Sequence, residues 1–413
     1  MSLIVFFMDQ KEGHIIPSFR LAASLKERGH TIVYLTIADN RKLVEEEGFL
    51  FYPVFQDIYP EGFHQANKRF KEVAEDNPGR EKRHLLGIIE GELDVFFAEY
   101  KPDLLIASAV LGLEMLLLHY KYHINPVIMS TSLREPPDVT LVTACVGNLL
   151  DLPLEVTNAI TEFVAGLDLD FTSLKEMLYP LEIFYELVLC PRELDMDMES
   201  VKERVFYLGP TILQQRSFGR KLDLDEVKSR KQIIYASLGS HAVTYGDACI
   251  WFFQALVNVM KYAGMQEMHL VLSVGLEFDA GLLGEIPGNV TVVDWVSQTD
   301  ILKDASLVIT HGGLGTIKES IYYGVPMIVF PMGYEQPRNA MLIEYHRLGI
   351  SAQIENITEE GLISDIRYIL NSPKIFTGIK KMQKIFREKE IAHTGVDIIE
   401  QIIREHAPRP CPY

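Results

Sequence analysis

The stretch WVSQTDILKDASLVITHGGLGTIKESIYYGVPMIVFPMGYEQPRNA, residues Trp295–Ala340, decides the fold. Its apolar run Leu307–Thr310 is typical of a buried parallel strand, and the glycine-rich turn His311–Thr316 follows directly. A helical pattern then covers Ile317–Tyr323. A strand that enters a helix through a glycine-rich turn can bind an anion, because the backbone amides approach it closely and the helix dipole contributes roughly half a positive charge.

Polar side chains in this turn extend the prediction to a nucleotide. Thr316 can donate a hydroxyl hydrogen bond and His311 an imidazole N–H to the same anion. Glu319 lies one turn into the helix and can accept hydrogen bonds from vicinal hydroxyls such as those of a ribose. A tight structural connection without a ligand is the alternative interpretation of the turn alone.

Alternating strand and helix patterns on both sides of this stretch predict an α/β chain with two halves. In the first half a helix over Ile15–Arg28 ends at Gly29 and lies between two apolar runs, which is one βαβ unit. We predict two Rossmann-like, doubly wound parallel sheets. The expected strands are Leu3–Met8, Thr31–Thr36, Leu104–Ala107, Pro126–Ser130 and Leu187–Cys190, then Gln232–Ala236, Met268–Val274, Val290–Val293, Leu307–Thr310 and Pro326–Phe330.

The predicted domain boundaries follow changes in composition. Residues 1–213 form an N-terminal domain, and the polar segment 214–231 is a linker. Residues 232–385 form a C-terminal domain, and 386–406 form a helix that packs back across the cleft between the domains. The proline-rich residues 407–413 are a tail.

Composition excludes several classes of protein. The 413 residues carry a formal net charge of -18, and such an acidic surface repels the phosphates of nucleic acids. The four cysteines form no CxxC pair, so we expect neither a disulfide framework nor structural zinc, and a cytoplasmic location. No apolar run is long enough for a transmembrane helix, although peripheral membrane contact stays open. We expect a monomer or a homodimer.

Taken whole, the quoted stretch resembles the signature of the UDP-glycosyltransferase family, whose fold is two Rossmann-like domains facing across a cleft (GT-B). The matching residues are Trp295, Gln298, Ile301, Leu302, Thr310, His311, Gly312, Gly313, Thr316, Glu319, Gly324, Pro326, Pro331, Glu335, Gln336 and Asn339. The tight match covers about a ninth of the chain. The stretch is similar to that of bacterial macrolide and natural-product glycosyltransferases of the family 1 type.

The resemblance implies roles in donor binding for matched positions. Trp295 stacks on the uracil ring, and Glu319 holds the ribose hydroxyls. Glu335 and Gln336 bind hydroxyls of the sugar. The implied donor-binding residues are Ser240, Trp295, Val296, Gln298, His311, Gly313, Thr316, Glu319, Glu335, Gln336 and Asn339, of which Ser240, His311, Gly313, Thr316 and Asn339 contact the diphosphate.

The first half matches the family pattern G-H-x-x-P at Gly13–Pro17, which implies that His14 is the general base. An imidazole suits this task because its unperturbed pKa is near 6.5. Many members orient this histidine with an aspartate after the strand that is Leu104–Ala107 here, but this chain has Ser108 at that place. We therefore expect that His14 works alone, that Glu114 reaches it, or that the acceptor hydroxyl is acidic enough to need little help.

The predicted activity is an inverting transfer of a sugar (a hexosyl transfer) from a UDP-sugar or TDP-sugar to a hydroxyl of a small, hydrophobic acceptor. We expect no metal requirement, because none of the D-x-D triplets near residues 168, 195 and 223 follows a strand beside the donor motif. The alternatives are a nucleotide-sugar epimerase or hydrolase of the same fold and a non-catalytic nucleotide-sugar-binding subunit. A nicotinamide-dependent oxidoreductase ranks last, since the first turn lacks GxGxxG.

Overall fold

The structure is a computed structural model of the chain, and its contacts divide into two units. The first unit is Met1–Leu189 with Asp197–Leu208 and His393–Tyr413, and the second is Cys190–Met196 with Gly209–Ala392. The residues that the structure describes are 1–63, 82–133, 145–146, 148–149, 151–167, 169, 173–196, 203–214, 227, 232–239, 242–276, 278–392 and 394–406.

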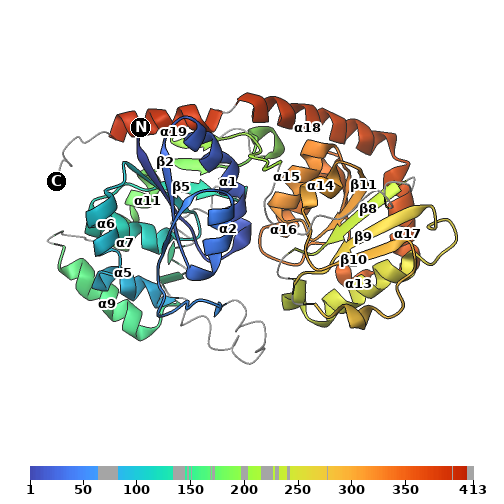
Figure 1. Cartoon of the computed structure of the whole chain (residues 1–413), viewed down its shortest axis with the longest axis horizontal. Coiled ribbons are helices and arrows are strands. Elements are labelled where there is room, and N and C mark those ends of the chain that lie inside the picture. The colour runs from blue at the N-terminus through green and yellow to red at the C-terminus, as the bar shows by residue number, and fades with distance from the viewer. Residues whose placement is uncertain are drawn as a thin grey trace. The chain divides into compact units, whose positions relative to one another are not determined.

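The first unit is built on a parallel seven-stranded sheet in the order β3-β2-β1-β4-β5-β6-β7 (Figure 1). Its central strands are apolar and almost fully buried, because helices cover both faces of such a sheet. The strands are β1 (Leu3–Phe7), β2 (Thr31–Thr36), β3 (Leu50–Pro53), β4 (Leu104–Ser108), β5 (Val127–Ser130), β6 (Glu186–Val188) and β7 (Val205–Tyr207).

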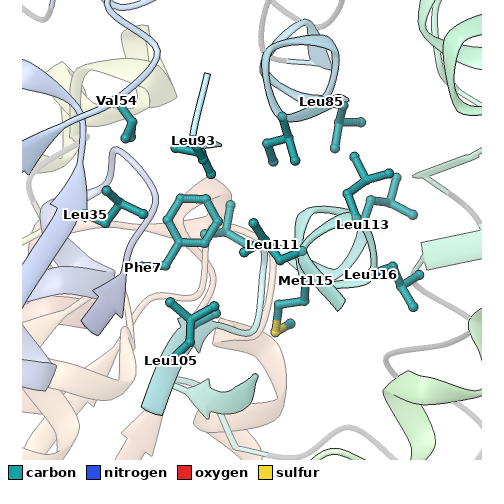
Figure 2. Close-up of a cluster of buried hydrophobic side chains, with 14 of the residues drawn as sticks. Phe7, Leu35, Val54, Leu85, Leu93, Leu105, Leu111, Leu113, Met115 and Leu116 are labelled. Atoms are coloured by element: carbon teal, nitrogen blue, oxygen red, sulfur yellow. The ribbon is translucent and has the colours of Figure 1, made fainter. Parts of the chain in front are cut away.

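Helices of the first unit bury an aliphatic and aromatic core against this sheet. Phe7 of β1 and Leu105 of β4 point toward the helices that carry Leu85 and Met115 (Figure 2). All four side chains are buried, so truncating any of them would cost about 2–5 kcal/mol of stability. The helices are α1 (Glu12–Glu27), α2 (Arg41–Glu46), α5 (His84–Glu90), α6 (Asp94–Tyr100), α7 (Gly112–Tyr122), α9 (Leu154–Ala165), α10 (Leu174–Leu178), α11 (Pro180–Ile183) and α19 (Thr394–His406), with the 3-10 turn η1 (Ala38–Asn40).

The second unit repeats this design with a parallel six-stranded sheet in the order β10-β9-β8-β11-β12-β13. Phe252, Phe253 and Phe330 form the aromatic centre of its core, with the rings of Phe252 and Phe330 edge to face at 5.0 Å. The strands are β8 (Gln232–Ser237), β9 (Met268–Ser273), β10 (Val290–Val293), β11 (Ala305–Thr310), β12 (Met327–Val329) and β13 (Gly349–Ser351).

Helices also flank the second sheet (Figure 1). The longest, α18, packs on α15, the helix that follows the glycine-rich turn. The α-helices are α13 (Asp247–Val259), α14 (Gln298–Leu302), α15 (Leu314–Tyr323), α16 (Gln336–Tyr345), α17 (Glu359–Leu370) and α18 (Pro373–Ala392), and the 3-10 turns are η3 (Arg192–Leu194), η4 (Ala242–Tyr245), η5 (Ala280–Leu283) and η6 (Ile354–Asn356).

The predicted fold class is confirmed, and every predicted strand overlaps an observed one. The unit boundaries differ from the predicted domains at three places. The second unit resumes at Gly209, within the predicted N-terminal domain. Cys190–Met196 belongs to the second unit, where the Asp195 carboxylate pairs with Arg338 at 2.8 Å. The predicted helix over 386–406 is instead the end of α18 in the second unit and α19 in the first. Most of the predicted linker and all of the tail lie outside the described residues.

The three cysteines that the structure describes, Cys145, Cys190 and Cys249, are buried free thiols. Burial raises their pKa to about 12, so they are unreactive thiols inside the two cores. In the described part of the chain no helix has both the length and the apolar composition needed to cross a membrane.

Gly349→Ala is expected to destabilise the second unit by about 3 kcal/mol. Gly349 begins β13 opposite Met327 of β12, and a Cβ there would lie 1.9 Å from the Met327 carbonyl oxygen. A backbone atom cannot move aside without breaking the strand pair. Urea unfolding followed by tryptophan fluorescence measures the effect. The control is Gly288→Ala, where a Cβ has nothing within 4 Å, and equal midpoints for the two variants would contradict the expectation.

Candidate active site

Each sheet has one point at which the strand order reverses, and loops at the carboxyl ends of the strands there diverge to leave a crevice. In the first unit this point lies between β1 and β4, because β2 and β3 extend from β1 while β5 follows β4. Asp9 and His14 follow β1, and Ser108 is the last residue of β4. The fold of the first unit therefore brings these three residues to one place.

His14 is held by a carboxylate that the sequence analysis did not identify. Its Nδ1 lies 2.6 Å from Oδ2 of Asp9, and the Ser108 hydroxyl donates to the same oxygen at 3.0 Å. The backbone N–H of Lys11 donates to the other oxygen, Oδ1, at 2.7 Å. The Asp9 side chain is 11% exposed and that of His14 24% exposed, so the imidazole keeps access to solvent while its partner is enclosed.

Asp9 is ionised in this arrangement. Burial raises the pKa of its carboxyl, but hydrogen bonds from His14, Lys11 and Ser108 and the charge of His14 outweigh burial, so the pKa lies below its usual value. An ionised carboxylate only accepts hydrogen bonds, so the proton of the shared bond sits on Nδ1 of His14. In the neutral imidazole the lone pair is then on Nε2.

The expected partners of His14 need correction. Glu114 does not reach His14, because its carboxylate pairs with His84 of α5. Ser108 takes part, but through Asp9. The available signal was an acidic residue directly after a buried strand and five residues before the histidine. The family pattern places the aspartate after the strand Leu104–Ala107, so it does not point to Asp9.

In the second unit the strand order reverses between β8 and β11. His311 follows β11, and its ring packs between two glycines, one from each loop. A Cβ at Gly239 would lie 2.8 Å from Cε1 of His311, and one at Gly313 would lie 2.7 Å from Nε2. Gly239 also has φ +85, which side-chain-bearing residues avoid. Glycine is therefore required at both positions for the two loops to close around the imidazole.

Asn339 of α16 stabilises the glycine-rich turn through a hydrogen bond to its backbone. Its side-chain N–H donates to the Gly312 carbonyl at 2.9 Å, and it is buried. The Gly312 N–H donates to the Thr310 hydroxyl at 3.3 Å. Since a Cβ at Gly312 would lie 2.6 Å from Cγ1 of Val329, the turn lies directly against β12. The structure thus shows Asn339 bonded to the backbone of the turn, where the resemblance implied a contact with phosphate.

The structure brings Gln298, Thr316 and Glu319 together where α14 meets α15. The Gln298 side chain donates to Oε2 of Glu319 at 2.7 Å and accepts from the Thr316 hydroxyl at 3.4 Å. Glu319 is buried in the second turn of α15. Trp295 is half-buried on the segment between β10 and α14, and the adjacent Val296 is buried.

The loop after β12 holds Glu335 and Gln336. Gln336 is buried, accepts from the Met332 N–H at 2.7 Å and donates to the Tyr245 hydroxyl at 3.3 Å. Tyr334 has φ 54 and is 89% exposed, an unusual backbone for an aromatic residue. The side chain of Gln336 thus closes the loop, and Glu335 at its end is half-buried. Ser240 lies outside the described residues.

Among the residues that the structure describes, no group of three or more histidine, cysteine, aspartate or glutamate side chains could hold a metal ion. Of the D-x-D triplets, Asp195 is paired with Arg338, and the other five aspartates, Asp168, Asp170, Asp197, Asp223 and Asp225, lie outside the described residues.

Comparison with known proteins agrees with this geometry. Residues 279–407, which include α15 and its turn, match the family described as "UDP-glucoronosyl and UDP-glucosyl transferase". NDP-glycosyltransferase YjiC of Bacillus subtilis is 26% identical over 402 residues, 96% of this chain and 96% of that protein. Demethyllactenocin mycarosyltransferase of Streptomyces fradiae is 24% identical over 98% of this chain and 87% of its own length.

The fold is also that of solved glycosyltransferases. The crystal structure of the glycosyltransferase of kitacinnamycin superposes with a TM-score of 0.76 at 24% identity, covering 97% of this chain and 98% of that one. The family match covers residues 279–407, from η5 to α19, and the relatives extend over nearly the whole chain. The chain is therefore a glycosyltransferase with the GT-B fold, and its residues 279–407 match the UDP-glycosyltransferase family.

Proposed function

We propose that the chain transfers a sugar from a UDP-sugar to a hydroxyl of a small, hydrophobic acceptor, with inversion at the anomeric carbon and without a metal ion. The observation that carries this proposal is the glycine-lined turn at the start of α15. There His311 and the backbone amide of Gly313 directly follow β11, and the buried Glu319 lies in the second turn of α15.

The donor is proposed to lie along the carboxyl ends of β10, β11 and β12. Its uracil stacks on Trp295, and its ribose hydroxyls bond to Glu319, which Gln298 orients. The diphosphate lies at the N-terminus of α15, with hydrogen bonds from His311 and Thr316. Two negative charges at a helix N-terminus that is already lined by amides need no further cation for binding. The sugar hydroxyls bond to Glu335 and Gln336.

In the proposed reaction Nε2 of His14 takes the proton of the acceptor hydroxyl. The acceptor oxygen then forms a bond to the anomeric carbon while the bond from that carbon to the diphosphate oxygen breaks. Its electron pair leaves with the diphosphate, which His311 and the amides of the turn stabilise. Fixed donors at the position where charge develops are usually the largest single contribution to catalysis. Attack opposite the leaving group inverts the anomeric configuration.

The apolar composition of the first unit supports a hydrophobic acceptor. Leucine side chains of α7 and Phe163 of α9 line an apolar cavity of about 20 Å³, which is itself too small to hold an acceptor molecule. Two relatives are named oleandomycin glycosyltransferase and demethyllactenocin mycarosyltransferase. We propose a polyketide, carotenoid, sterol or flavonoid as the acceptor class.

The proposal is tested with UDP-glucose and dTDP-glucose as donors and a flavonoid, kaempferol, as acceptor, with mass spectrometry of the products. We expect a glucoside with UDP-glucose, an unchanged rate in EDTA, and by NMR a β-linkage from the α-linked donor. Release of UDP at equal rates with and without acceptor would favour a hydrolase. A faster reaction with dTDP-glucose would overturn the assignment of UDP, and an α-linkage would overturn inversion.

Glu319→Ala is expected to weaken UDP binding by about 10–100-fold, because a charge-assisted hydrogen bond contributes about 1.5–3 kcal/mol. Isothermal titration calorimetry with UDP measures the affinity. The loss should be smaller for dUDP, which lacks one of the two ribose hydroxyls. The control is Glu388→Ala on α18, whose carboxylate is 64% exposed in a surface ion pair and contributes little. Equal losses for UDP and dUDP would contradict the ribose contact.

A further inference from the structure

We propose that Asp9 is the positioning residue for His14, and that it supplies from the end of β1 the carboxylate that Ser108 cannot supply from the end of β4. The inference rests on the proposed function, in which His14 is the base. It concerns how the imidazole is oriented and charged, and it assigns to Ser108 the task of orienting the carboxylate.

The contacts of Asp9 fit this role. Its Oδ2 is the common acceptor for Nδ1 of His14 at 2.6 Å and for the hydroxyl of Ser108 at 3.0 Å. Its Oδ1 accepts the Lys11 N–H at 2.7 Å. These three hydrogen bonds, to both oxygens of the carboxylate, restrict the orientation of the Asp9 side chain. The bond to Nδ1 in turn restrains the orientation of the imidazole ring.

The backbone that carries Asp9 is held as firmly as its side chain. The Thr36 hydroxyl, at the end of β2, donates to the Asp9 carbonyl oxygen at 3.1 Å. Asn40 donates to the Thr36 hydroxyl at 3.1 Å, and both Thr36 and Asn40 are buried. The loop after β1 is thereby bonded to β2 as well as to β4. A carboxylate that only neutralised a surface histidine would need none of these supports.

The bond to Asp9 determines which nitrogen of His14 can accept the proton of the acceptor hydroxyl. With Nδ1–H bonded to Asp9, only Nε2 can accept the acceptor proton, and the imidazole becomes an imidazolium. Asp9 stays ionised throughout and stabilises that positive charge at short range in an enclosed site. In the serine hydrolases the carboxylate beside the base histidine acts in the same way, and replacing it by an amide there reduces turnover by about 10⁴-fold.

Because β1 and β4 are neighbours in the sheet, a carboxylate from the end of β1 can take the place of one from the end of β4. Both strands end at the point where the strand order reverses, so their last residues lie side by side. A carboxylate on either loop can reach the same imidazole. Here the longer side chain comes from the β1 loop and the shorter hydroxyl from β4, and the hydroxyl donates to the carboxylate.

The test compares Asp9→Asn with the wild type, using UDP-glucose and the series phenol, 4-nitrophenol and pentafluorophenol as acceptors of rising acidity. We expect kcat with phenol to fall by about 10²-fold or more. The KM for UDP-glucose and the affinity for UDP should stay unchanged. The loss should shrink along the series, because an acceptor that ionises readily needs less help from the base. A merely structural defect would lower all three rates alike.

The matched control is Asp103→Asn. The Asp103 carboxylate accepts a hydrogen bond from the Leu3 N–H at 2.7 Å, at the opposite end of β1 from His14. The change therefore also removes a carboxylate that bonds to the backbone, but far from His14. Its kcat should stay within about threefold of the wild type. The rescue variant is Asp9→Asn combined with Ser108→Asp, which moves the carboxylate to the neighbouring strand and should recover at least about tenfold in kcat over Asp9→Asn alone.

The outcomes separate this inference from the proposed function. If His14→Ala is inactive while Asp9→Asn keeps the kcat of the wild type, the role of Asp9 is overturned and transfer by His14 stands. The role of Asp9 also fails if its loss is equal for all three phenols and the double variant recovers nothing. If the wild type transfers no sugar from any donor, the proposed function itself fails.

Discussion

His14→Ala is expected to lower kcat for sugar transfer by about 10²–10⁴-fold, the usual contribution of a general base. Nδ1 of the imidazole is already bonded to Asp9, so Nε2 is the atom proposed to take the proton of the acceptor hydroxyl. Steady-state rates with UDP-glucose measure the loss. Because the nucleotide is proposed to bind residues of the second unit, the affinity for UDP should not change.

The control for this variant is His123→Asn. His123 is exposed and has φ 55, a backbone conformation that asparagine tolerates. Its kcat should equal that of the wild type. Loss of UDP affinity in His14→Ala that matches its loss of kcat would show that the histidine acts in donor binding and would remove it as the base.

His311→Ala is expected to lower kcat by about 10²–10³-fold, which is the effect of losing one fixed donor to a developing negative charge. The ring is placed by contact with Gly239 and Gly313, so it does not have to reorganise when the diphosphate leaves. The affinity for UDP should fall as well, while that for uridine, which has no diphosphate, should stay unchanged. Calorimetry with the two ligands measures the difference.

This comparison carries its own control, because uridine shares every contact of UDP except those of the diphosphate. An equal loss of affinity for both ligands would mean that His311→Ala has distorted the turn between β11 and α15. It would then give no support to the proposed phosphate contact.

Burial decides which parts of the fold could be predicted from the sequence. Central strands such as β1 and β4 are continuous apolar runs, because helices cover both faces of the sheet. The strands that were not predicted, β3, β7 and β13, are short and lie at sheet edges. Most of their residues are half-buried, and runs of three or four residues are too short to show a strand pattern in the sequence. Their pairing comes from tertiary contacts.

Some residues of the candidate site could also be predicted from the sequence and others could not. The turn at His311 could be predicted, because glycines directly between a buried strand and a helix are typical of a tight strand-to-helix turn. The roles of Asn339 and Asp9 could not, since each depends on which way a side chain points across neighbouring elements. Asn339 bonds to the backbone of the turn. Asp9 turns back toward the helix that follows it, and no spacing rule for a helix or strand covers a residue in the loop between them.

The central claim is that a nucleotide diphosphate binds at the N-terminus of α15. A crystal structure of the chain soaked with UDP tests this most directly. We predict the diphosphate within hydrogen-bond reach of His311, Thr316 and the amides of the turn, with uracil against Trp295 and ribose at Glu319. Density for the diphosphate at any other part of the chain, with this turn unoccupied, would contradict the account.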